Sequence, residues 1–84
     1  MSGGRRFNLR RQMALIQHIV VAYAPRKGIT RNQLRSLLYL IDLEAYLRRG
    51  RSITGAKYRR GKRNVIVQGL SRSLRQLREE GRIV

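Results

Sequence analysis

The sequence predicts a mostly α-helical domain with a small β component, an α+β fold of three main helices and short strands. Apolar residues recur at helical spacing in three stretches, and glycines and a single proline separate these stretches. Residues typical of strands and turns lie between the second and third stretches. With 84 residues, 42% of them hydrophobic, the chain has enough apolar surface for one modest core. We therefore expect one domain over residues 7–84, preceded by a flexible basic leader over residues 1–6.

The first helix is expected from Asn8 to about Tyr23. Its apolar residues repeat every three or four positions and would form one stripe: Leu9, Met13, Ile16 and Val20. Pro25 and Gly28 then interrupt the pattern, which predicts the end of this helix and a turn before the next one.

The second helix is expected to follow Thr30, to run to about Arg49 and to stop at Gly50. Thr30 and Gln33 fit a capping box, in which each side chain bonds to the backbone amide of the other residue. The apolar residues fall on two nearly opposite faces. One face comprises Leu34, Leu37, Leu38, Ile41 and Ala45, and the other comprises Leu40, Leu43 and Leu47. A helix that is apolar on two sides is typical of one sandwiched between other elements, so this helix is expected to be the core of the domain.

The segment over residues 51–64 is expected to contain a short strand and a basic loop, because β-branched and aromatic residues alternate there with glycines and six basic residues. A final helix is predicted over about residues 67–80 and should end at Gly81. Residues 82–84 are expected to form a strand. Three leucines of the final helix would face the core: Leu70, Leu74 and Leu77.

The charge of the chain is the strongest indication of its function. Twenty lysines and arginines stand against four acidic residues, which gives a formal net charge of +16. Only three of the twenty are lysines. Arginine presents a planar fork of donors that matches phosphate oxygens and stacks on bases. The composition therefore predicts a nucleic acid as the partner, with counterion release as the driving force for binding.

The third predicted helix carries polar residues opposite its leucines. These residues are Gln68, Ser71, Arg72 and Arg75. The stretch from Leu70 to Ile83 resembles the recognition helix and first wing strand of a winged-helix domain. The resemblance implies that the polar face enters a major groove, where arginine reads guanine and glutamine reads adenine. The alternative is an ordinary amphipathic surface helix that ends at a glycine.

A second resemblance covers about Leu34 to Val84. It is carried by Leu37-Leu38-Tyr39-Leu40, Asp42, Glu44-Ala45, Arg49-Gly50-Arg51, Ile53-Thr54-Gly55-Ala56 and Tyr58. This run is similar to the core of the Panacea, or SocA-like, domain, whose members are antitoxins and proteolytic adaptors. The chain departs from the family where Gly61-Lys62-Arg63-Asn64 replaces the usual Gly-Pro pair. The resemblance implies a winged-helix-like fold and a protein-binding role, although that role does not require a charge of +16.

Two further basic groups are expected to contact phosphates. The central group is expected as a mobile loop that follows the backbone of the nucleic acid, and the N-terminal group as an arm that reaches along or into a groove. The central group consists of Lys57, Arg59, Arg60, Lys62 and Arg63, and the N-terminal group of Arg5, Arg6, Arg10 and Arg11. The alternative for the central group is a solvated loop. Tyr58 is expected to pack on the core rather than to stack on a base.

The sequence predicts no enzyme, no cofactor and no metal ion. His18 is the only histidine, cysteine is absent, and Asp42 and Glu44 do not face each other on a helix. We expect Asp42 to bond to an arginine or to a tyrosine hydroxyl. The longest apolar stretch is too short for a bilayer, and no secretory signal is recognisable. The protein is therefore expected to be cytoplasmic, nucleoid-associated or packed in a virion, with no membrane partner.

The function predicted from the sequence is binding of double-stranded DNA through its phosphate backbone, largely without sequence selectivity. Packaging of DNA in a nucleoprotein assembly and regulation by a small DNA-binding protein are both consistent with this function. DNA is favoured because a recognition helix fits a B-form major groove, whereas A-form RNA offers no readable major groove. A ribosomal protein, or another protein that binds structured RNA, is the alternative. An antitoxin-like protein-binding module is a third interpretation, which rests on the family resemblance alone.

Overall fold

The structure is a computed structural model that describes residues 6–23 and 28–81. Within these residues the chain forms three helices and an antiparallel hairpin between the second and third helices. The elements are α1 (Leu9–Tyr23), α2 (Arg31–Arg49), β1 (Tyr58–Arg60), β2 (Val65–Val67) and α3 (Leu70–Glu79). This arrangement confirms the predicted α+β class with three helices and short strands. The predicted strand over residues 82–84, most of the predicted leader and Pro25 lie outside the described residues.

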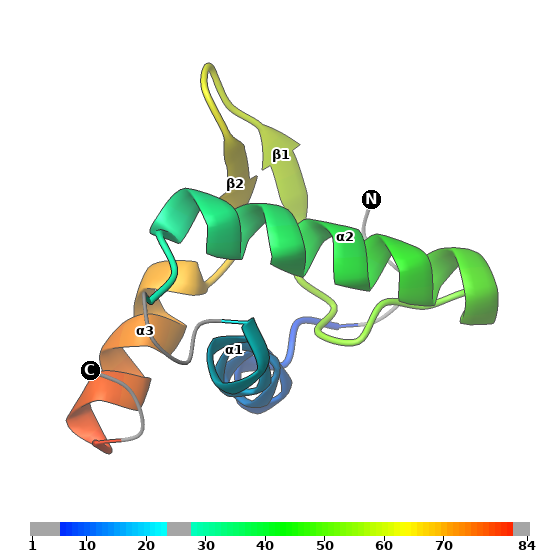
Figure 1. The fold of residues 1–84 in the computed structure, drawn as a ribbon. Coiled ribbons are helices and arrows are strands. Elements are labelled where there is room, and N and C mark those ends of the chain that lie inside the picture. The colour runs from blue at the N-terminus through cyan, green and yellow to red at the C-terminus, as the bar shows by residue number, and fades with distance from the viewer. Residues whose placement is uncertain (1–5, 24–27, 82–84) are drawn as a thin grey trace.

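The hairpin rises from one side of α2, and α1 lies on the other side together with α3 (Figure 1). Apolar side chains from all three helices meet between them and are joined by one residue from β2 and one from the loop that precedes β1. The buried core consists of Met13, Ile16, Ile19, Leu34, Leu38, Ala56, Val67, Leu70, Leu74 and Leu77. Burial of this apolar surface is the main contribution to the stability of the fold.

Local capping interactions fix both ends of α2 where the sequence predicts them. The Thr30 hydroxyl accepts the Gln33 backbone N–H at 3.1 Å, and the Gln33 side-chain oxygen accepts the Thr30 backbone N–H at 3.0 Å. At the other end Gly50 adopts a φ of 79°, and its N–H donates to the Tyr46 carbonyl oxygen at 2.8 Å. The left-handed conformation is open to glycine without a steric penalty, so the helix ends there.

α2 lies between the hairpin and α1 (Figure 1), but the expectation that both of its apolar faces are buried is wrong. One face is buried as predicted, through Leu34 and Leu38. On the opposite face Leu40 and Leu47 are 55% and 73% exposed. The physical reason is that the hairpin and α1, which lie on opposite sides of α2 (Figure 1), leave these two leucines uncovered by any described element.

The predicted start of the third helix also requires correction. Val67 is the last residue of β2, and α3 begins at Leu70 after a turn at Gly69. Val67 pairs with Tyr58 across the hairpin, and this pairing is available only because the chain reverses between them. Gly69 has a φ of 75°, and a Cβ atom there would lie 2.3 Å from the Phe7 ring. Only glycine permits this turn beside Phe7.

Candidate nucleic-acid interface

The outer face of α3 is polar and basic, as the sequence predicts. Leu70, Leu74 and Leu77 are buried against the core. The opposite face exposes Ser71, Arg72, Arg75 and Arg78. Because the leucines anchor the helix, these side chains occupy one fixed face of the molecule.

Gln68 lies in the turn before α3 rather than on the helix. Its side-chain oxygen accepts the Lys57 backbone N–H at 2.9 Å, and its own backbone N–H donates to the Lys57 carbonyl oxygen at 3.0 Å. Its carbonyl oxygen accepts from the buried Gln12 side chain at 2.8 Å. Gln68 therefore joins the base of the hairpin to α1 and to the start of α3, and its amide oxygen is already engaged within the protein.

The central basic group forms a closed hairpin. Arg59 pairs with Ile66 and Arg60 pairs with Val65 in the antiparallel register. At the turn the Gly61 N–H donates to the Asn64 carbonyl oxygen at 2.8 Å. All five predicted basic residues of this group are exposed: Lys57, Arg59, Arg60, Lys62 and Arg63.

The tip of the hairpin is attached to α2. The Asn64 side-chain amide donates to the Asn32 side-chain oxygen at 3.0 Å, and Asn32 also accepts from Arg35 at 3.0 Å. The segment predicted as a basic loop is therefore a hairpin: Arg59 and Arg60 lie in β1, and Lys62 and Arg63 lie in the turn.

A buried carboxylate fixes the base of the hairpin. Asp42 is fully buried on α2, and its Oδ1 accepts the backbone N–H groups of Ile53 at 2.9 Å and Thr54 at 3.2 Å. Its Oδ2 accepts the hydroxyl groups of Thr54 and Tyr58. The predicted bond from Asp42 to a tyrosine is thereby confirmed. These four bonds join α2, the loop after it and β1 at one point.

Tyr58 packs on the core, as expected. Its ring meets the Tyr39 ring edge to face at a centroid distance of 5.4 Å, and its hydroxyl lies 3.2 Å from the Leu38 carbonyl oxygen. Burial raises the pKa of the Tyr58 phenol above its ordinary value, and the hydrogen bond to Asp42 raises this pKa further. Tyr58 therefore stays protonated and serves as a structural donor.

The N-terminal basic group divides between two surfaces. Arg5 lies outside the described residues, and Arg6, Arg10 and Arg11 are exposed. Arg10 borders a hollow between α1 and α3 that also includes Gln76 and Glu80. Arg11 borders a pocket beside the end of α2.

The structure brings some of the predicted residues together and separates others. Lys57 bonds to Gln68 in the turn before α3, so the hairpin base adjoins the start of α3. The hairpin tip and α1 lie on opposite sides of α2 (Figure 1). Two arginines that the sequence analysis did not select, Arg49 and Arg51, line the pocket together with Arg11. The sequence signal for them is their position on either side of the helix-ending Gly50.

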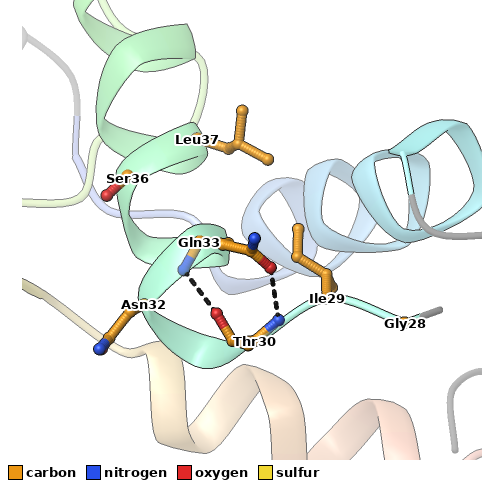
Figure 2. Close-up of a pocket in the computed structure, with 7 residues that line it drawn as sticks. All are labelled: Gly28, Ile29, Thr30, Asn32, Gln33, Ser36 and Leu37. Atoms are coloured by element: carbon orange, nitrogen blue, oxygen red, sulfur yellow. Dashed lines mark hydrogen bonds between the residues drawn. The ribbon is translucent and has the colours of Figure 1, made fainter.

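A second pocket lies at the start of α2, with a volume of about 950 Å³ (Figure 2). Figure 2 shows Thr30 and Gln33 joined by the two bonds of the capping box, with Ile29 and Leu37 beside them. Its described lining residues are Gly28, Ile29, Thr30, Asn32, Gln33, Ser36 and Leu37. Since none of these is charged and the capping side chains already have partners, the pocket offers no acid, base or nucleophile pair.

Two further features of the described residues bear on other functions. Within the described residues, no three histidine, cysteine, aspartate or glutamate side chains are grouped so that they could hold a metal ion. None of the described helices combines the length and the apolar character needed to cross a membrane.

Comparison with protein-family models, with curated proteins and with solved structures gives no match for this chain. The resemblances to the winged-helix and Panacea domains therefore stay predictions from the sequence, and the function is argued from the surface itself.

Proposed function

We propose that the protein binds double-stranded DNA through its phosphate backbone, largely without reading the base sequence. The observation that carries the proposal is the distribution of the +16 charge. No acidic residue occurs between Arg48 and Glu79, and this interval includes the hairpin and all of α3 except its last residue, Glu79. A surface with one sign of charge attracts a polyanion and releases its counterions.

The shape of the surface supports a duplex as the ligand. The outer face of α3 is a helical face of the width that a B-form major groove admits, and Arg72 and Arg75 project from it. The hairpin adjoins the start of this helix and exposes Arg59 and Arg60. Contacts from arginines to phosphates position a protein on DNA without specifying sequence, so packaging of DNA fits this surface better than selective regulation.

The test uses nuclease-treated protein, two unrelated DNA duplexes and an RNA hairpin, with affinity measured by fluorescence anisotropy across a salt series. We expect tighter binding to both duplexes, with similar affinities and a steep linear fall of log K with log salt. A preference for the RNA hairpin at physiological salt would replace the proposal with an RNA-binding role. Weak binding to every nucleic acid would overturn it.

Matched double variants locate the contact surface. K62Q/R63Q changes the hairpin tip, R72Q/R75Q changes α3, and R31Q/R48Q removes two exposed charges from α2 as a control. All three variants have the same net charge. We expect the first two to flatten the log–log slope by roughly 1 to 2, about 0.9 for each lost phosphate contact, and the control to flatten it less. Equal slopes for all three variants would place the contact elsewhere.

A further inference from the structure

Three arginines from separate segments line one pocket at the C-terminal end of α2. Arg11 comes from the first turn of α1, Arg49 is the last residue of α2, and Arg51 follows the glycine that ends this helix. The pocket has a volume of about 600 Å³, and its other described lining residues are Ala45, Ser52 and Ile53. None of the described lining residues carries a carboxylate.

The backbone around the pocket is fixed on both sides. The Asn8 N–H donates to the Thr54 carbonyl oxygen at 2.8 Å, which joins the start of α1 to the loop after α2. Asn8 also caps α1, because its side-chain oxygen accepts the Arg11 N–H at 3.0 Å. Asp42 holds the same loop from the other side through Ile53 and Thr54. Arg11, Arg49 and Arg51 therefore line one pocket because the fold holds their segments together.

Nothing in the described lining neutralises these three charges. The Asp42 carboxylate is buried and already accepts four hydrogen bonds, and Glu44 pairs with Arg48 at 3.1 Å. The dipole of α2 favours a cation at its C-terminal end, which explains Arg49. It does not explain why Arg11 and Arg51 line the same pocket. Like charges held together repel each other, and a bound oxyanion would relieve this repulsion.

We propose that the pocket formed by Arg11, Arg49 and Arg51 binds a phosphate group. The planar donor fork of arginine matches phosphate oxygens, and several such forks around one site give a multidentate contact. A volume of about 600 Å³ admits a phosphate with its attached sugar. The proposal rests on the proposed function only for the source of the phosphate, which in a DNA complex is the backbone. Inorganic phosphate offers the same tetrahedral oxyanion.

The first experiment measures phosphate binding without nucleic acid. Inorganic phosphate is titrated into ¹⁵N-labelled protein at constant ionic strength, with chloride as the reference anion. We expect saturable shifts of the arginine Nε–Hε signals and of the Ser52 and Ile53 amides. R49Q/R51Q should weaken phosphate binding at least tenfold, whereas R31Q/R48Q, which has the same net charge, should retain it. Shifts that do not saturate, or equal losses in both variants, would overturn the site.

The second experiment identifies the source of the phosphate. The salt dependence of duplex binding is compared between the same two variants, and a single contacted phosphate predicts a slope lowered by about 0.9 for R49Q/R51Q. If this variant loses phosphate binding but matches the control on DNA, the site holds free phosphate and the backbone source is overturned. If the wild-type protein binds phosphate but no duplex, the proposed function fails while the phosphate site stands. Unchanged thermal melting of both variants confirms that each is folded.

Discussion

The two sides of α2 differ in a way that reverses the usual rule for burial. The inner side of α2, which carries Leu34, Leu38 and Asp42, buries the Asp42 carboxylate completely. The outer side, which carries Leu40 and Leu47, leaves these two leucines more than half exposed. The difference lies in the partners on each side. The loop after α2 and β1 supply the carboxylate with two backbone N–H groups and two hydroxyls. On the outer side no described element buries Leu40 or Leu47.

This comparison shows that burial follows the available partners as well as hydrophobicity. Burying an ionised carboxylate costs several kcal/mol, and hydrogen bonds to the charge offset that cost. Within the described residues, no buried side-chain nitrogen or oxygen atom lacks a hydrogen-bond partner. The inner side of α2 therefore acts as the attachment point for the hairpin and for the loop that carries Arg51.

The largest effect is expected at the buried carboxylate. Asp42→Ala removes the acceptor for four donors. Two N–H groups and the Thr54 hydroxyl are left without this acceptor, whereas the Tyr58 hydroxyl still has the Leu38 carbonyl oxygen. We expect the free energy of unfolding to fall by about 3–5 kcal/mol. Urea denaturation followed by circular dichroism measures the loss.

Glu44 supplies the control for this prediction. It lies on the same helix, its side chain is 62% exposed, and it pairs with Arg48. Glu44→Ala removes the same charge from the surface and should change stability little, because exposed ion pairs contribute little. Similar losses for both variants would show that net charge, rather than the buried bonds, determines the effect of Asp42.

The second prediction compares leucines from the two sides of α2. Leu38 is fully buried, and Leu38→Ala should destabilise the protein by about 2–5 kcal/mol through lost burial and a cavity. Leu47 is 73% exposed, and Leu47→Ala should change the free energy of unfolding by less than about 0.5 kcal/mol. A large loss for Leu47→Ala would mean that the outer side is covered in solution. Thermal and urea unfolding at several protein concentrations show whether the outer side of α2 is exposed or covered in solution.

Local sequence signals predict the parts of the fold that neighbouring residues determine. The capping box at Thr30, the stop at Gly50 and the inward face of α3 all depend on residues within one or two helical turns. The local pattern places Val67 at the start of the third helix, whereas the structure places it in β2, because its pairing with Tyr58 depends on a partner across a turn. The exposure of Leu40 was missed because a helical wheel shows which face is apolar, not whether another element covers it.

The candidate site divides in the same way. Exposure of Arg72 and Arg75 follows from the spacing of the leucines on their own helix. The meeting of Arg11 with Arg49 and Arg51 could not be predicted, because α1 and the loop after α2 are far apart in the sequence. The hydrogen bond that joins α1 to this loop runs between the backbone groups of Asn8 and Thr54, so it requires no particular side chain that the sequence could reveal.

Among the three buried or half-buried side chains Asp42, Leu38 and Tyr58, the smallest effect is expected at Tyr58, and it depends on pH. Tyr58→Phe removes one donor to Asp42 and should cost about 1.5–3 kcal/mol near neutral pH, because this hydrogen bond is to a charged group.

Burial and Asp42 raise the pKa of the folded Tyr58 above its ordinary value of 10.0, so the folded state retains its proton longer than the unfolded chain does. The contribution of this phenol is therefore fully present below pH 10.0 and declines as the pH rises above it. The stability difference between wild type and Tyr58→Phe should accordingly shrink by up to about 1.4 kcal/mol for each pH unit above that value, less any screening by solvent. Urea unfolding of both proteins at about pH 8 and about pH 11 tests this, because the two proteins differ only in the Tyr58 hydroxyl. A difference that stays constant between the two pH values would show that Tyr58 is not a protonated donor held by Asp42.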